Sequence, residues 1–412
     1  MRRHAWLAYL AEQIALFFQS QLLAFLAIVC KTLAMIESDN PHSVSFSPLE
    51  WRASAFCRRA ARPSRAPVLD ASEIHRVLND LDVWDAWPLA DRSGAPVAWR
   101  GGELWFALAA PAFDDPEARH AHARIHHFHR TDRFEHIAAT FPDGFSPGSR
   151  EWSGSAILDG DEVTLYFTAA GYRNEDAISF QQRLFASTTR LSDDPETIFT
   201  DWSEPRELVK PDDIFYVSQH EGTGQIGEIK AFRDPFPWTD GDGSQYLLFT
   251  ASAAQSRDRF NGVIGCALRG EDGAFTALAP LVDACGVNNE LERPHIVEHG
   301  SQLYLFWSTQ AKVFAPGITA PTGLYGAVAE QLKGPWRLLN GDGLVFATPE
   351  NEPFQTYSWW VLPDLSVTSF VDYWGVDDPD AQQKPAGRSH FGGTFAPFLH
   401  LRLTGDQARL ET

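Results

Sequence analysis

Short, strongly apolar runs recur along the chain after residue 80, and each has the length and the aromatic and aliphatic content of a buried β-strand. Turn-forming segments such as Asp159-Gly160-Asp161 lie between them, as expected for hairpins. A polar motif precedes each run, so a motif strand and a buried strand repeat five times. The five runs are Leu104–Leu108, Leu165–Thr168, Tyr246–Thr250, Leu303–Trp307 and Val367–Val371.

This repeat predicts an all-β fold, a five-bladed β-propeller with a central active-site funnel. In that architecture the first strand of each blade lines the central axis. The polar motifs would therefore meet in one funnel although they are far apart in sequence. They centre in turn on Asp85, Ser153, Asp234, Glu292 and Tyr357.

Composition and charge narrow the classes of ligand. The chain has 412 residues, of which 44% are hydrophobic and 21% charged, as in ordinary globular proteins. Its net charge of −20 repels nucleic acid and anionic membrane surfaces, so we expect neither as a partner. The 14 tryptophans suit packing against sugar rings, although most are expected in the core.

Three carboxylates lie in dense motifs that place acid, arginine and tryptophan side by side. Cleavage of a glycosidic bond by double displacement needs one carboxylate as nucleophile and one protonated carboxyl group as acid. The motifs therefore indicate a retaining enzyme that acts on sugars. They are Val83-Trp84-Asp85-Ala86-Trp87, Phe232-Arg233-Asp234-Pro235-Phe236 and Glu290-Leu291-Glu292-Arg293-Pro294-His295.

These motifs resemble glycoside hydrolase family 68, which contains levansucrases, inulosucrases and bacterial β-fructofuranosidases. The resemblance runs in the family's order from about residue 50 to the C-terminus and implies the same propeller fold. It also implies a levansucrase-type fructosyltransferase, with sucrose as donor and fructan, sucrose or water as acceptor. The alternatives are a β-fructofuranosidase that mainly hydrolyses sucrose, and an inulosucrase. Further matching segments are Glu151-Trp152-Ser153-Gly154-Ser155, Pro353-Phe354-Gln355-Thr356-Tyr357-Ser358 and Gly392-Gly393-Thr394-Phe395-Ala396-Pro397.

The resemblance assigns Asp85 as nucleophile, Asp234 as transition-state stabiliser and Glu292 as acid/base. It implies substrate-binding roles for eight further residues: Trp84, Trp152, Ser153, Arg233, Glu290, Arg293, Gln310 and Tyr357. Arg293 is expected to bind substrate hydroxyls or to orient Glu290.

Two positions depart from many relatives. Gln310 stands where these have Arg or His, and Trp359 stands where they have His after Tyr-Ser. These two differences leave open which glycosidic linkage is formed and how long the product is. The three carboxylates themselves are present.

No metal or cofactor is expected. The GxGxxG match at residues 222–227 lacks the strand-then-helix context of a dinucleotide site. The histidines from His120 to His129 are expected on a solvated strand, because residues 120–126 alternate and no carboxylate completes a metal site.

The N-terminal 40 residues are expected to be an extension, and residues 41–412 the single catalytic domain. Polar residues interrupt the apolar character of the extension, so we expect no stable membrane span. Three interpretations of the extension remain open: an atypical signal or anchor, an amphipathic helix, or an upstream start codon with Met35 as the true start. Secretion or a periplasmic location is expected, with a cytoplasmic location as the alternative. The oligomeric state is left open.

Overall fold

The computed structural model of the protein describes residues 46–58, 63–192, 194, 197–218 and 229–411. The N-terminal 40 residues and the GxGxxG match lie outside these ranges. The described chain is β-structure joined by loops and short 3-10 helices, none of which is long enough to cross a bilayer. The 3-10 helices are η1 (Ala53–Arg58), η2 (Ala71–Glu73), η3 (Pro116–Ala121), η4 (Ala311–Val313) and η5 (Leu339–Gly341).

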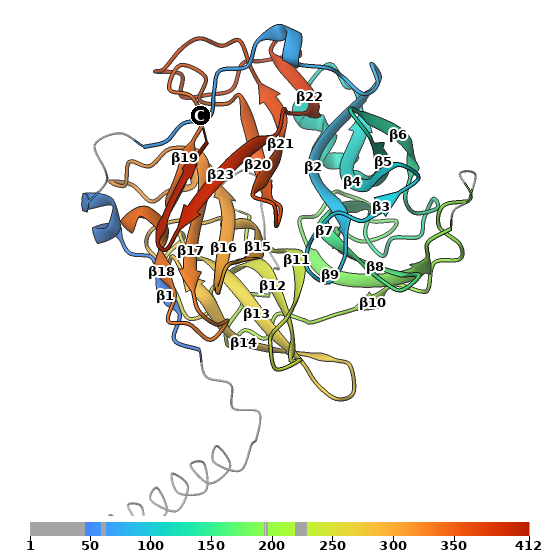
Figure 1. The fold of residues 1–412 in the computed structure, drawn as a ribbon, viewed down its shortest axis with the longest axis horizontal. Coiled ribbons are helices and arrows are strands. Elements are labelled where there is room, and N and C mark those ends of the chain that lie inside the picture. Colours follow the sequence, from blue (N-terminus) through green and yellow to red (C-terminus); the bar gives the residue numbers. More distant parts are fainter. Residues whose placement is uncertain (1–45, 59–62, 193, 195–196, 219–228, 412) are drawn as a thin grey trace, which may run out of the picture. The chain divides into compact units, whose positions relative to one another are not determined.

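The strands form five blades around a central axis, as Figure 1 shows. Blades I and II share one sheet, because the last residues of β2 pair in parallel with β7 at Leu89↔Ala156 and Ala90↔Ile157. Blade I contains β2 (Leu81–Ala90), β3 (Ala98–Trp99), β4 (Gly102–Pro111), β5 (Arg124–Arg130) and β6 (Phe134–Ala139). Blade II contains β7 (Arg150–Asp159), β8 (Glu162–Ala170), β9 (Gln182–Arg190) and β10 (Arg206–Glu207).

The remaining three blades are separate sheets. Blade III contains β11 (Phe232–Thr239), β12 (Gln245–Ser252), β13 (Gly262–Arg269) and β14 (Phe275–Asp283), with β1 (Leu49–Glu50) added at its outer edge. Blade IV contains β15 (Glu292–His299), β16 (Gln302–Thr309), β17 (Gly323–Ala329), β18 (Arg337–Leu338) and β19 (Leu344–Ala347). Blade V contains β20 (Thr356–Val361), β21 (Ser366–Tyr373), β22 (Phe391–Phe395), β23 (Leu399–Thr404) and β24 (Gln407–Leu410).

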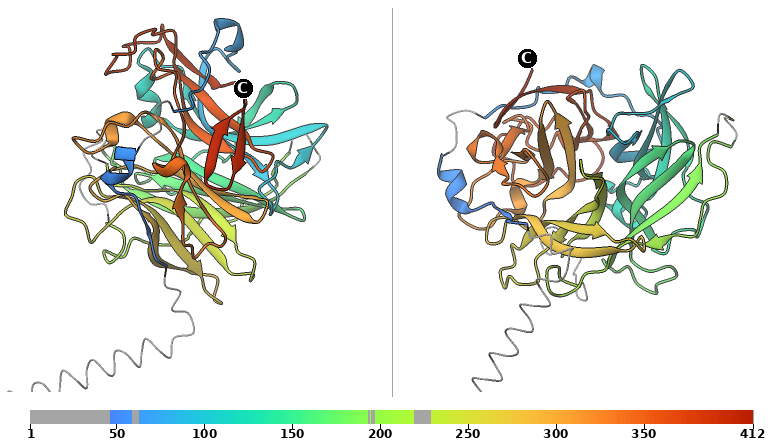
Figure 2. Two further views of the ribbon diagram at one scale, coloured as in Figure 1. Left: turned by 60° about the vertical axis from the view of Figure 1, so that its left-hand side comes forward. Right: turned by 60° about the horizontal axis from the view of Figure 1, so that its bottom comes forward.

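The five-bladed propeller is therefore confirmed, and each apolar run of the sequence forms the second strand of a blade. Figure 2 shows the blades from two further directions. The motif strands β2, β7, β11, β15 and β20 are the innermost strands (Figure 1).

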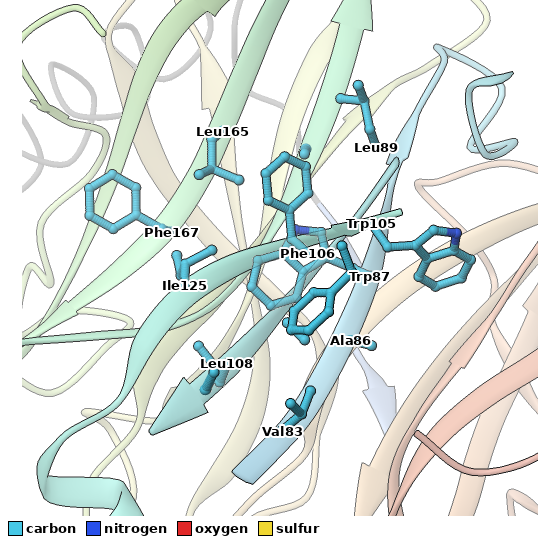
Figure 3. Packing of buried hydrophobic residues seen from close by; sticks show 14 of the residues in the cluster. Val83, Ala86, Trp87, Leu89, Trp105, Phe106, Leu108, Ile125, Leu165 and Phe167 are labelled. Carbon is cyan, nitrogen blue, oxygen red and sulfur yellow. The ribbon is translucent and has the colours of Figure 1, made fainter. Parts of the chain in front are cut away.

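Apolar side chains fill the spaces between neighbouring blades. Figure 3 shows one such cluster, where Trp87 of β2 stacks on Phe106 of β4 with ring centroids 6.2 Å apart. Leu165 and Phe167 of blade II pack in the same cluster. Each fully buried side chain of this size stabilises the fold by about 1.5–3 kcal/mol. This packing keeps the inner strands in a fixed arrangement.

A buried ion cluster joins the first blade to the last. Asp82, at the start of β2, is fully buried. It accepts hydrogen bonds from Arg76, at 2.9 Å, and from Arg388, which precedes β22. Arg76 also donates to the Gly392 carbonyl of blade V at 2.7 Å. A buried charge with two partners tolerates little displacement, so the cluster fixes β2 against blade V.

Candidate active site

Every inner strand carries a β-bulge at the same level, where two residues face one on the second strand. The register shifts lie at Trp84/Trp87, Trp152/Ser155, Arg233/Phe236, Glu292/His295 and Tyr357/Trp360. A bulge changes the direction of side chains that would otherwise alternate, so consecutive polar residues can face the axis together.

The bulges require unusual backbone geometry. Asp85, Asp234, Arg293 and Ser358 occupy equivalent positions and have φ of 52°, 60°, 53° and 61°. Aspartate tolerates this left-handed region better than most residues do. In blade II the equivalent position is Ser153, and the next residue must be glycine, because a Cβ at Gly154 would lie 1.9 Å from the Tyr166 carbonyl oxygen.

Hydroxyl groups on the second strands secure three of the bulges. Thr168 accepts a hydrogen bond from the Asp234 amide at 3.0 Å, Thr250 from the Arg293 amide at 3.2 Å, and Ser308 from the Trp359 amide at 3.0 Å. Each bond crosses from one blade to the next. These three residues were not predicted, although a hydroxyl residue lies at or just after the end of three of the apolar runs.

A cavity of about 800 Å³ opens at the level of the bulges. All eleven residues that the sequence assigned to catalysis or substrate binding line it. The cavity is large enough for a disaccharide, since small-ligand sites span about 300–1,000 Å³.

Asp85 is held by one short hydrogen bond. The Ser153 hydroxyl on β7 donates to Oδ2 of Asp85 at 2.6 Å. Strong bonds of this kind involve a charged acceptor and fix its orientation. The other oxygen, Oδ1, is then the one positioned for chemistry.

Glu292 has a different environment. Arg233 Nη2 donates to its Oε1 at 2.8 Å, and the Tyr357 hydroxyl donates to its Oε2. Burial, followed by the charge of Glu292, raises the pKa of Tyr357 well above its usual value, so its proton stays in place. Gln310 also hydrogen-bonds Tyr357.

Arg233 joins the acidic groups of the site. Its Nη2 lies 3.8 Å from Glu290 Oε2, and its Nε lies 3.6 Å from Asp234 Oδ2. Burial opposes its charge, but Glu292, Glu290 and Asp234 together outweigh burial and raise the pKa of Arg233. The guanidinium therefore remains charged and keeps three carboxylates close together.

Asp234 is buried and well coordinated. Its Oδ2 accepts a hydrogen bond from Thr250 at 2.9 Å and from the Arg293 amide at 3.2 Å. Burial raises the pKa of Asp234 to about 6; Arg233 opposes this rise, and the charges of Glu292 and Asp85 add to it. Asp85 and Glu292 thus both lie near enough to Asp234 to act on its charge.

Comparisons with known proteins show the family to which the chain belongs. The family described as Levansucrase/Invertase matches residues 63–266 and 260–411. The chain belongs to glycoside hydrolase family 68.

Levansucrase LscC of Pseudomonas savastanoi pv. glycinea is 30% identical over 90% of this chain and 92% of its own. An inulosucrase from Halalkalicoccus jeotgali, solved with bound kestose, is 32% identical with a TM-score of 0.78, over 88% of this chain and 95% of its own. A levansucrase from Gluconacetobacter diazotrophicus shares the fold at 23% identity, with a TM-score of 0.75 over 89% and 90% of the two chains.

In this family 68 chain, Arg293 braces the inner strands. Its side chain is 2% exposed. Nη1 donates to the Ser358 hydroxyl at 2.8 Å, and Nη2 donates to the Ala86 carbonyl at 2.6 Å. One guanidinium from blade IV thereby fixes the residue after Asp85 in blade I and the bulge of blade V. These bonds give Arg293 a positioning role that the sequence did not indicate; its contact with substrate stays a prediction.

Part of the cavity rim was not predicted. η3 places Arg119 with its guanidinium carbon 5.5 Å from the centre of the Trp84 ring. Lys384 reaches the rim from blade V and pairs with Asp372 at 2.7 Å. Lys384 lies in the loop between β21 and β22, where sequence periodicity gives no signal, and its partner Asp372 lies in the buried strand β21.

The histidine prediction was wrong in part. Asp115 caps η3 and Pro116 begins it, so His120 lies on a 3-10 helix and the strand starts only at Arg124. His127 is buried rather than solvated, and burial lowers its pKa to about 3. Within the described ranges, His, Cys, Asp and Glu form no group of three or more that could hold a metal ion.

Proposed function

We propose that the protein transfers fructosyl units from sucrose by double displacement, as a levansucrase-type enzyme. The observation that carries this proposal is the pair of carboxylates Asp85 and Glu292. Both line one cavity, and each is held by a different set of donors.

The first step breaks the bond between glucose and fructose. Glu292 gives its proton to the glycosidic oxygen while Asp85 Oδ1 attacks the anomeric carbon of the fructosyl unit. Glucose leaves with the proton, and a covalent fructosyl-enzyme remains. Ser153 keeps Oδ2 of the nucleophile in place during the attack.

The second step reverses the roles. Glu292, now ionised, takes the proton of an acceptor hydroxyl, whose oxygen attacks the anomeric carbon and frees Asp85. The acceptor is fructan, sucrose or water. Arg233 and Tyr357 orient Glu292 in both steps through its two oxygens.

The other predicted residues surround this centre. Trp84 and Trp152 offer aromatic faces for the sugar rings, and Asp234 is placed to stabilise the positive charge that develops on the fructosyl ring. Gln310 and Glu290 lie beside Tyr357 and Arg233, where the leaving glucose and the incoming acceptor would bind.

Two variants test the assignment. Asp85→Asn and Glu292→Gln should each lower sucrose turnover by more than about 1,000-fold, because each removes a group that acts in the transition state. Circular dichroism and thermal unfolding check that the fold is kept. Turnover above a few per cent in a folded variant would refute the role of that residue.

Product analysis completes the test. Incubation with sucrose should release glucose faster than free fructose, since transferred fructosyl units do not appear as fructose. Equal release would assign the protein to the hydrolytic alternative, and no release would refute sucrose as donor.

A further inference from the structure

A second cavity, of about 470 Å³, lies on the other side of the bulges; residues of all five blades line it, and most of them belong to blades II and III. It is lined by the inner strands beyond their bulges, including Ser155–Ile157 of β7 and Phe236–Thr239 of β11. It shares no lining residue with the active-site cavity.

A rigid layer separates the two cavities. The His295 ring stacks on Trp360 with centroids 4.4 Å apart and planes 9° apart. Its Nε2 accepts a hydrogen bond from the Val361 amide at 2.9 Å, and its Nδ1 forms a hydrogen bond with the Arg293 carbonyl at 2.9 Å. Burial lowers the pKa of His295 to about 3, so the ring is neutral. These contacts hold both rings in place where they line the second cavity.

The walls of the second cavity carry aromatic side chains that are only partly covered. Phe236 and Trp238 come from β11, Tyr166 from β8 and Phe275 from β14. Flat aromatic faces of this kind pack against the apolar faces of sugar rings.

Polar groups at the outer end come from both blades. Arg206 of blade II and Arg269 of blade III donate to the same Gly273 carbonyl, at 3.2 and 3.4 Å. Arg269 also donates to Gln245 at 2.6 Å. Burial raises the pKa of Tyr166, and these two arginines oppose the rise, so both lie near its hydroxyl.

The charges of the lining are mixed. Four carboxylates and three guanidinium groups line the cavity, those of Asp91, Asp159, Glu162, Glu204, Arg92, Arg206 and Arg269. An anion would meet the carboxylates and a cation the guanidinium groups, whereas a neutral polyhydroxyl ligand can bond to both kinds of group.

We propose that this groove between blades II and III is a second carbohydrate site that binds fructo-oligosaccharides, the product class of the reaction. The proposal rests on the proposed function for the identity of the ligand. A chain held there raises the local concentration of long acceptors around the enzyme. The groove therefore favours extension of existing chains over transfer to water.

Binding is measured by calorimetry with a fructo-oligosaccharide of about five units in the Asp85→Asn background, which prevents turnover. We expect two sites, one in each cavity. Adding Trp238→Ala should weaken the groove site at least tenfold and leave the other site unchanged. Tyr172→Ala is the matched control, because Tyr172 is an exposed aromatic residue of blade II that lines neither cavity.

Each outcome decides the proposal. A single site that Trp238→Ala does not affect would overturn it, as would displacement of the ligand by inorganic phosphate. If Trp238→Ala fails to fold, Tyr166→Phe and Arg269→Ala test the same groove. Absence of binding at the active-site cavity would count against the proposed function instead. With Asp85 intact, Trp238→Ala should keep the rate of sucrose cleavage and shorten the products.

Discussion

Replacing Asp234 with Asn should make the protein more stable and less active at the same time. The pKa of Asp234 rises from 3.8 to about 6 on folding, chiefly because the side chain is buried. At about 1.4 kcal/mol per unit, the ionised carboxylate costs the fold about 3 kcal/mol. Asn avoids this cost because it carries no charge. Its carboxamide oxygen can still accept the hydrogen bond from the Thr250 hydroxyl.

The sign of the pH dependence follows from the same shift. Below pH 3.8 the carboxyl group is protonated in both states, so its contribution to stability is fully present there. As the pH rises, the unfolded chain loses the proton first, and the contribution is lost by about pH 6. The Asn variant does not lose this stability, so the difference in the free energy of unfolding between variant and wild type should grow between pH 4 and pH 7 and then stay constant.

Urea unfolding at pH 5 and pH 8 measures this difference. At pH 8 the variant should be more stable by about 2–3 kcal/mol, while sucrose turnover falls by about 100- to 1,000-fold through loss of electrostatic stabilisation. Asp132→Asn, at an exposed turn, is the matched control and should change neither quantity. A variant less stable than the wild type at pH 8, or a difference independent of pH, would refute the reasoning.

Three further predictions concern other parts of the chain. Ser153→Ala removes the 2.6 Å bond to Asp85 and should lower kcat by about 10- to 100-fold with little change in KM; a change in KM alone would assign Ser153 to sucrose binding. Gln310→Arg should alter the ratio of transfer to hydrolysis, seen in free fructose relative to glucose, more than it alters sucrose cleavage; the reverse would place Gln310 in the donor site. A chain that begins at Met35 should be soluble and cleave sucrose at close to the full-length rate, because all five blades lie within residues 46–411; aggregation or lost activity would contradict this.

The sequence predicted the blades because burial leaves a direct signal. A second strand with both faces covered is apolar along most of its length, as in the run Leu303–Trp307 of β16, and such runs are visible without any alignment. The carboxylates were also predictable, since Asp85, Asp234 and Glu292 each lie among arginine or tryptophan residues.

The interactions that hold the carboxylates could not be predicted in the same way. The bonds from Arg293 to Ala86 and Ser358 span three blades, and they depend on how the ring closes. The bulges interrupt the alternation of strand side chains, so periodicity alone predicts that half of the motif residues face away from the axis. Asp115-Pro116 is a local signal for the start of η3, but the alternating histidines that follow it favour a strand.

The stacked rings of His295 and Trp360 follow the bulges of β15 and β20, and in the part of the chain that the structure describes no residue lines both cavities. Sucrose, glucose and acceptor are therefore expected to enter and leave on the side of the catalytic carboxylates. In the proposed double displacement, glucose departs before the acceptor reacts with the fructosyl-enzyme, which is a ping-pong order. Accumulated glucose should occupy the place of the acceptor and regenerate sucrose. A growing chain, for its part, extends outward into solvent after each addition, so the size of the cavity sets no upper limit to its length.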